Sequence, residues 1–286
     1  MDLIELKRTL ADIPLSRIHY FDRIDSTNSE AARLAEAGAS DLTLVVADEQ
    51  TAGRGRAGKC WTTLPGTALA FSLVLRMPAE DRAHYSRFAT RYTALSALAV
   101  CDALEQNYGL GTHIKWPNDV LIGGRKICGV LSEASWLGDR LQAVILGIGV
   151  NVFQSGVPHD GEVDYPATSV EQSLKDSRES NVAGINTIDR LVFLKEILSQ
   201  IIRMRTSLYK PEFTRTWEKR LAYRGRWVEI ATLGRDNVVR GQVLGLEQDG
   251  SLQLKDVDGK IFKVSSGGVS LREVENQDDR PIFHTI

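Results

Sequence analysis

The chain reads THIKWPNDVLI at residues 112–122, KICGVLSEASW at 126–136 and LQAVILGIGVNV at 141–152. Each stretch is rich in apolar and β-branched residues, which favours a β-strand. Only short turns, marked by Gly123-Gly124 and Gly138-Asp139, separate them. Such connections join antiparallel neighbours, because parallel strands need a long crossover. We therefore predict an α+β fold with an antiparallel or mixed sheet and helices on one face, and not a doubly wound sheet.

Further elements extend this core toward the N-terminus. LTLVVAD at 42–48 and TALAFSLVLR at 67–76 have the composition of buried strands. Residues 27–37 predict a short helix, because Ser26 or Thr27 can cap its start and a glycine follows its end. Apolar residues at spacings of three and four predict a long amphipathic helix over 84–107.

The pattern changes in the last third of the chain. Residues 187–219 have helical periodicity, with a second helix starting at Pro211, whereas residues 154–166 are turn-rich and are expected to form a mobile loop. Short alternating stretches separated by glycines then predict a small all-β barrel. We therefore expect a larger domain at 1–222, a barrel at 223–275 and a loose tail at 276–286.

Composition excludes several classes of protein. Hydrophobic residues make up 43% of the 286 residues and charged residues 25%, with a net charge of −2. These values fit a globular protein and exclude a general basic surface for nucleic acid. Cys60, Cys101 and Cys128 form no CxxC pair, and the histidines have no metal-binding spacing. The most apolar stretch, 143–153, is too short for a membrane span. We expect a cytoplasmic protein that binds neither membrane nor nucleic acid.

A glycine-rich basic loop, GRGRAGK, occupies residues 53–59. Its glycines let the backbone approach a ligand and donate N–H groups to it. Arg54, Arg56 and Lys59 add cations that suit a polyphosphate or an acyl phosphate. The loop is not a P-loop, because Cys60 occupies the hydroxyl position, nor does it have the Rossmann spacing. A flexible linker with solvated arginines is the alternative reading.

The sequence KWPND at 115–119 places a cation, an amide and a carboxylate around one turn. Lys115, Asn118 and Asp119 suit a nucleotide phosphate and Mg²⁺, although Asp119 could equally serve an Asx-turn. Lys126 precedes an apolar run, where a lysine often packs its aliphatic stem and only extends its ammonium group to solvent. The glycines of GIGVNV (147–152) indicate close packing or a ligand against the strand, and Asn151 there must find a partner.

Four segments together resemble the biotin–protein ligases: DSTNSEA (25–31), the GRGRAGK loop with Gln50 and Trp61, KWPND followed by RKICGVLSE, and GIGVNV. The resemblance covers about residues 18–175, and residues 223–272 resemble the family's Src-homology-type barrel. It implies a class II synthetase-like catalytic fold. The family loop is commonly GRGRRGR, so Ala57 removes one cation and Lys59 replaces an arginine. Too few residues precede the ligase core for the DNA-binding domain of some members, so a repressor role is not expected.

The resemblance implies a two-step reaction: biotin and ATP form biotinyl-5′-adenylate, whose biotinyl group then passes to a lysine of biotin carboxyl carrier protein or another carboxylase acceptor domain. Arg56 and Lys126 would be catalytic, and Asp119 would hold magnesium. The residues implied to bind biotin are Ser26, Thr27, Asn28, Gln50, Arg54, Gly55, Arg56, Lys126 and Gly129. Those implied to bind ATP are Arg54, Arg56, Lys59, Trp61, Lys115, Asn118, Asp119 and Asn151, with Trp61 stacking near adenine. A homodimer is compatible with the resemblance, but the sequence does not give the oligomeric state.

Two other functions compete with this one. A lipoate–protein ligase would share the sheet and a lysine, but GRGR together with KWPND is not expected there. The basic loop could also bind RNA or DNA, with Trp61 stacking on bases. The near-neutral net charge and the shortness of the basic loop weigh against nucleic acid.

Overall fold

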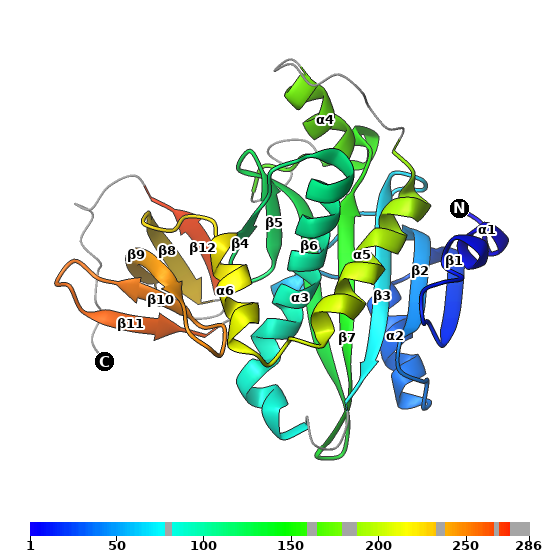
Figure 1. Ribbon diagram of the computed structural model, residues 1–286, viewed down its shortest axis with the longest axis horizontal. Coiled ribbons are helices and arrows are strands. Elements are labelled where there is room, and N and C mark those ends of the chain that lie inside the picture. Colours follow the sequence, from blue (N-terminus) through cyan, green and yellow to red (C-terminus); the bar gives the residue numbers. More distant parts are fainter. Residues whose placement is uncertain (78–81, 159–164, 179–187, 233–237, 266–268, 275–286) are drawn as a thin grey trace.

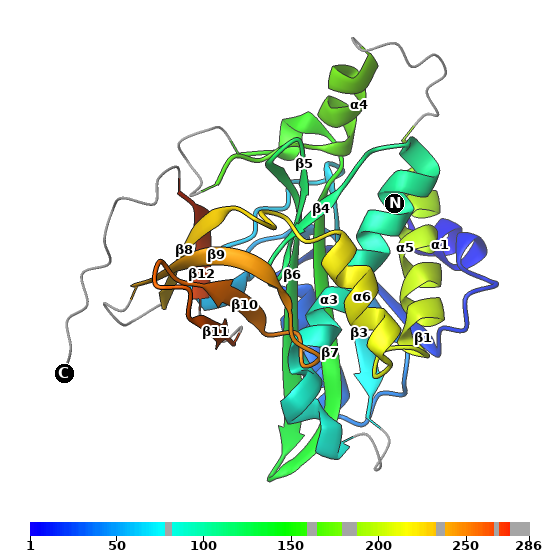
Figure 2. The same ribbon diagram turned by 60° about the vertical axis from the view of Figure 1, so that its left-hand side comes forward.

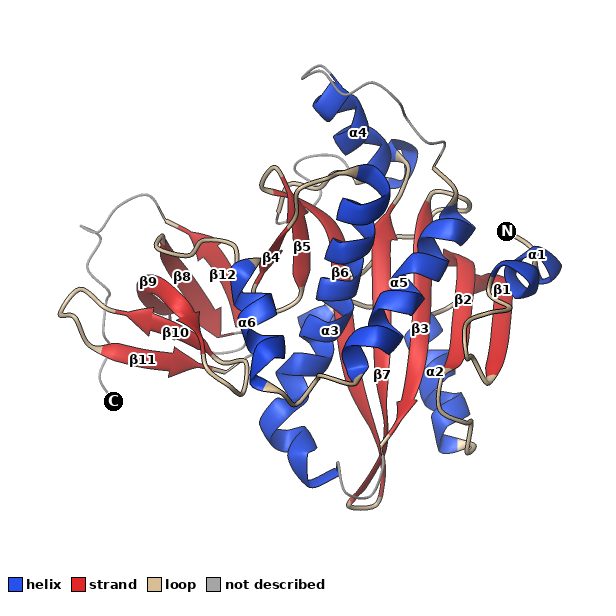
Figure 3. Ribbon diagram, viewed as in Figure 1, coloured by secondary structure: helices blue, strands red, loops and turns tan. Residues whose placement is uncertain are grey.

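The computed structural model describes residues 1–77, 82–158, 165–178, 188–232, 238–265 and 269–274. The chain forms a seven-stranded mixed sheet and a five-stranded antiparallel sheet, with helices packed mainly on the first (Figures 1 and 3). This confirms the predicted fold class. The predicted tail, and residues 159–164 of the loop predicted at 154–166, lie outside the described residues. Within the described ranges, no helix combines the length and the apolarity that a membrane span requires.

The larger sheet has the strand order β1-β2-β3-β7-β6-β5-β4. Its strands are β1 (Arg17–Ile24), β2 (Thr43–Gln50), β3 (Ala68–Arg76), β4 (His113–Lys115), β5 (Asp119–Ile122), β6 (Arg125–Leu137) and β7 (Arg140–Asn151). The predicted antiparallel pairing of consecutive strands is confirmed from β4 to β7. The pair β1 and β2 is parallel, which makes the sheet mixed; the sequence analysis did not predict β1. The stretch at 112–122 is not one strand, because KWPND turns the chain between β4 and β5 with a cis peptide at Trp116-Pro117.

The helices are α1 (Leu3–Thr9), α2 (Thr27–Glu36), α3 (Arg82–Tyr108), α4 (Val170–Arg178), α5 (Arg190–Arg205) and α6 (Pro211–Lys219). Of these, α1 and α4 were not predicted. Pro211 begins α6, as expected for a residue whose missing N–H costs nothing at a first helical position. Short 3₁₀ turns lie at Arg56–Gly58 and Gln154–Gly156.

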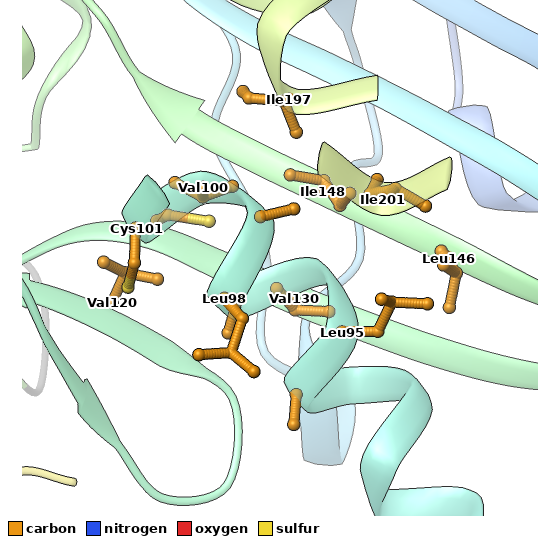
Figure 4. Packing of buried hydrophobic residues seen from close by; sticks show 14 of the residues in the cluster. Leu95, Leu98, Val100, Cys101, Val120, Val130, Leu146, Ile148, Ile197 and Ile201 are labelled. Carbon is orange, nitrogen blue, oxygen red and sulfur yellow. The ribbon is translucent and has the colours of Figure 1, made fainter. Parts of the chain in front are cut away.

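The main core lies between the sheet and the pair α3 and α5. Leu95 and Leu98 of α3 and Ile197 and Ile201 of α5 pack with Val130 and other strand residues (Figure 4). Burial of these apolar side chains is the main source of stability at this face. The long amphipathic helix predicted at 84–107 is thereby confirmed as α3.

The expectation that helices cover one face of the sheet is wrong. Side chains along a strand alternate between faces, so Leu44 and Val46 of β2 face the main core while Val45 faces the other side. There Ala31 and Ala35 of α2 pack against the sheet in a second apolar cluster. This helix was predicted correctly, but only its tertiary contacts show that it covers the opposite face. The N-terminus of α2 thereby reaches the sheet face on which the glycines of β7 lie.

The smaller sheet has the order β11-β10-β9-β8-β12 and follows α6. Its strands are β8 (Trp227–Thr232), β9 (Val238–Leu246), β10 (Leu252–Lys255), β11 (Ile261–Val264) and β12 (Val269–Glu273). The domain break at 222 stays a prediction.

The smaller sheet lies beside α6 (Figure 2). Two side chains of the larger unit hold the turn between β9 and β10. The buried Arg91 of α3 donates to the carbonyl oxygens of Gln248 and Leu208. Trp116, within KWPND, donates from Nε1 to the carbonyl oxygen of Gly250 at 3.0 Å. These bonds satisfy buried donors and bring β12 to the edge of the site described next.

Candidate functional site

A cavity of about 500 Å³ opens where the N-terminus of α2, the loop at 53–59, the β4–β5 turn and the glycines of β7 meet. Every site residue predicted from the sequence lines it: Ser26, Thr27, Asn28, Gln50, Arg54, Gly55, Arg56, Lys59, Trp61, Lys115, Asn118, Asp119, Lys126, Gly129 and Asn151. These positions span more than a hundred residues of sequence, and the sheet brings them into one volume.

Hydroxyl and amide groups form one end of the cavity. Ser26 caps α2, and Thr27 donates to Gln50 Oε1 from its backbone N at 2.9 Å and from Oγ1 at 3.0 Å. The fully buried Ser72 of β3 donates to Asn28 Oδ1 at 2.6 Å and lies within 2.8 Å of Thr27 Oγ1. Buried polar groups that satisfy one another are held in fixed orientations, so this end is prepared for a polar, uncharged ligand group.

The basic loop folds back on itself beside these groups. The backbones of Arg54 and Cys60 form an isolated antiparallel β-bridge. The backbone N–H of Gly55 donates to the carbonyl oxygen of Lys59 at 2.6 Å, and Ala57 has a φ of 57°. A left-handed conformation is unusual for a residue with a side chain. A Cβ at Gly53 would come within 2.3 Å of the carbonyl oxygen of Trp61, so glycine is required there for close packing. These contacts disfavour the alternative reading of a solvated linker.

Cationic side chains converge on the other end of the cavity. Arg56 donates from Nη1 to Asn118 Oδ1 at 3.1 Å, and burial lowers its pKa while Asp119 acts in the opposite direction. Lys126 Nζ lies 2.7 Å from Asp119 Oδ1, which also accepts a hydrogen bond from Asn118 Nδ2 at 3.0 Å. The ammonium of Lys126 therefore points at a carboxylate within the site, which disfavours the reading that it only extends to solvent.

Lys115 is the most enclosed of these cations. Its side chain is 8% exposed, and its Nζ lies 3.6 Å from the centre of the Tyr165 ring, within cation–π range. Burial lowers the pKa of Lys115 to about 8. The hydroxyl of Tyr165 contacts that of Tyr223, a residue of the segment that leads into the smaller sheet.

Trp61 lies flat against the glycines of the sheet. A Cβ at Gly149 would come within 2.3 Å of the indole, and one at Gly129 within 3.0 Å. The glycines of GIGVNV therefore allow close packing of a side chain, one of the two readings expected from the sequence. The Nε1 of Trp61 is buried without a hydrogen-bond partner among the described residues. Asn151 has found a partner, because it donates from Nδ2 to the carbonyl oxygen of Thr168 at 3.0 Å.

Four functional positions were missed by the sequence analysis: Ser72, Glu133, Tyr165 and Arg272, of which the last two line the cavity and the first two contact Asn28. Ser72 could have been noticed in the sequence, because it is a small polar residue within an apolar strand. Arg272 belongs to β12, and only the docking of the smaller sheet brings it to this site.

The arrangement suits the joining of two anions. A hydroxyl and amide pocket can hold a neutral ring, and the adjacent cations reduce the repulsion between a carboxylate and a phosphate. Among the described residues, no three or more His, Cys, Asp or Glu side chains gather as a metal site. Among the described residues that line the cavity, only Asp119 offers a carboxylate between cations, and it fits Mg²⁺ only where substrate phosphates supply further ligands.

Comparison with known proteins agrees with this geometry. Residues 20–151 match the Biotin/lipoate A/B protein ligase family. The bifunctional ligase/repressor BirA of Bacillus spizizenii is 35% identical over 257 residues, which cover 88% of this chain and 73% of the relative. The biotin–[acetyl-CoA-carboxylase] ligase of Mycobacterium tuberculosis is 31% identical over 253 residues and 85% of each chain. The biotin protein ligase from Aquifex aeolicus, solved in complex with biotin and ATP, superposes with a TM-score of 0.73 at 29% identity, over 91% of this chain and 100% of the other.

Proposed function

Because this chain belongs to the Biotin/lipoate A/B protein ligase family, and within it is a biotin–protein ligase, we propose that it joins biotin and ATP into biotinyl-5′-adenylate and transfers the biotinyl group to a lysine of a carboxylase acceptor domain. Biotin carboxyl carrier protein is the acceptor we expect. The observation that carries the proposal is the single cavity, in which a hydroxyl and amide pocket adjoins a cluster of cations.

Each end of the cavity has a role in the proposed first step. Thr27, Asn28 and Gln50 would hold the ureido ring of biotin, because their amide and hydroxyl groups match its donors and acceptor. The carboxylate of biotin would then point toward Arg56 and Lys126. These cations would offset the repulsion between that carboxylate and the α-phosphate as they approach.

The nucleotide would occupy the cationic end. Arg54, Lys59 and Lys115 would contact phosphates, and the indole of Trp61 would lie beside adenine. Asn118 and Asn151 would supply amides to the nucleotide. Mg²⁺ would be held by Asp119 together with phosphate oxygens, where it would neutralise phosphate charge.

In the second step, the amine of the acceptor lysine would attack the acyl carbon of the mixed anhydride and release AMP. No covalent bond to the enzyme is required, so catalysis would rest on positioning and charge neutralisation. We place this reaction in the cytoplasm, where ATP is available and where the three unpaired cysteines would stay reduced. The absence of a repressor role stays a prediction, and a homodimer stays compatible with the resemblance.

The proposal is tested by adding biotin, lipoate or RNA to the protein with magnesium-ATP and measuring pyrophosphate release. Biotin alone should stimulate release, and mass spectrometry should then find one biotinyl group on a purified acceptor domain. Release with lipoate instead of biotin, or adenylation without transfer to the acceptor lysine, would contradict the proposal.

A further inference from the structure

Glu133 of β6 contacts both the hydroxyl and amide end of the cavity and the basic loop, without having been predicted as a site residue. Its Oε2 accepts a hydrogen bond from Asn28 Nδ2 at 2.7 Å and pairs with Arg54 Nη2 at 2.8 Å. Asn28 belongs to the hydroxyl and amide end, and Arg54 belongs to the basic loop. A single carboxylate oxygen therefore links the two parts of the site.

The amide of Asn28 has only one orientation that satisfies all its neighbours. Its NH₂ group donates to Glu133 and also to the carbonyl oxygen of Leu131 at 3.2 Å. Its Oδ1 accepts from Ser72 and lies over Gly147, where a Cβ would come within 2.0 Å. A flipped amide would place NH₂ against the Ser72 hydroxyl and oxygen against two acceptors, which is unfavourable for a buried group.

We propose that Glu133 is a positioning residue that sets ligand specificity by fixing the Asn28 amide so that its carbonyl oxygen, and not its NH₂ group, is presented to the bound ligand. An amide held in this way accepts a hydrogen bond and selects a ligand with an N–H donor, such as a cyclic urea. Arg54 keeps the Glu133 carboxylate in place, so the basic loop supports the same orientation. This inference rests on the proposed function for the identity of the ligand.

An acidic residue is needed at position 133 because both of its partners are hydrogen-bond donors. An apolar side chain would leave one N–H of Asn28 without an acceptor, and only the bonds to the Leu131 carbonyl oxygen and from Ser72 would then hold the amide in this orientation. A charged acceptor makes a stronger hydrogen bond than a neutral one and fixes the group more firmly. Loss of the fixed orientation of the Asn28 amide should raise the dissociation constant for biotin by about tenfold or more.

The test is a double-mutant cycle with Asn28→Ala and Glu133→Ala, measured as the calorimetric dissociation constant for biotin without ATP. We expect Glu133→Ala to raise that constant by about tenfold in the wild-type background, and by less than about twofold once Asn28 is alanine. Should Glu133→Ala fail to fold, Glu133→Met keeps the side-chain length without an acceptor and serves in the same cycle.

The matched control is Asp41→Ala, which breaks a pair with Arg205 at 2.7 Å whose side chains are about as exposed as those of Glu133 and Arg54; neither Asp41 nor Arg205 lines the cavity. It should lower the melting temperature by an amount similar to Glu133→Ala and leave biotin binding unchanged. Additive effects in the cycle, or wild-type biotin affinity in Glu133→Ala, would overturn the positioning role. Failure of the wild type itself to bind biotin would instead contradict the proposed function.

Discussion

Replacing Lys126 by glutamine tests whether its ammonium acts on the substrates. In the structure this group pairs with Asp119 at 2.7 Å and lies 5.6 Å from the centre of the Trp61 ring. On the proposed mechanism it exchanges the carboxylate of Asp119 for the anions of biotin and the adenylate. A charge-assisted hydrogen bond is worth about 1.5–3 kcal/mol, so kcat/KM for adenylation should fall about 10- to 150-fold.

The effect on folding should be much smaller. The side chains of Lys126 and Asp119 are 26% and 15% exposed, and an ion pair that solvent still reaches contributes about 0.2–1 kcal/mol. Asp119 keeps the hydrogen bond from Asn118, so the substitution leaves no buried carboxylate without a partner. The melting temperature should therefore fall by no more than about 4 °C.

Pyrophosphate release and thermal unfolding are measured on the same preparation. Lys195→Gln is the control, because Lys195 pairs with Asp12 at 2.8 Å and has a similarly exposed side chain, 30%, outside the cavity. This control should retain wild-type adenylation. Adenylation within twofold of wild type in Lys126→Gln, accompanied by a lowered melting temperature, would refute the reasoning and assign Lys126 to structure.

Three further predictions concern the same cavity. Arg56→Ala should release biotinyl-adenylate and biotinylate a bystander protein, and a variant as selective as wild type would remove Arg56 from this role. Gly149→Ala should weaken ATP binding about tenfold or more, because the new Cβ displaces Trp61, whereas Gly111→Ala, with nothing within 4 Å, should not. The pKa of Lys115 is about 8, so KM for ATP should rise as the pH passes 8 in the wild type but not in Lys115→Met. Wild-type stability relative to Lys115→Met should increase between pH 8 and 10.5, because the unfolded chain holds that proton longer.

Local sequence determined much of the fold. The apolar stretches that form β2, β3, β6 and β7 and the periodicity of α3 are properties of contiguous residues, and a glycine pair is enough to make neighbouring strands antiparallel. The residues of the candidate site were named mostly from the resemblance to the biotin–protein ligases, and one cavity brings them together; local chemistry by itself indicated the glycine-rich basic loop and the KWPND turn.

Contacts between distant residues decided the rest. Nothing in the sequence of α2 says which face of the sheet it covers, since an amphipathic helix fits either face and only the alternation of the assembled strands selects one. Arg272 reaches the cavity because Arg91 and Trp116 bind the turn between β9 and β10, which follows both of them by more than a hundred residues in the sequence. Glu133 shows the physical reason most clearly: a glutamate on a strand reads as a solvent-facing residue until folding places Asn28 and Arg54 against the same oxygen.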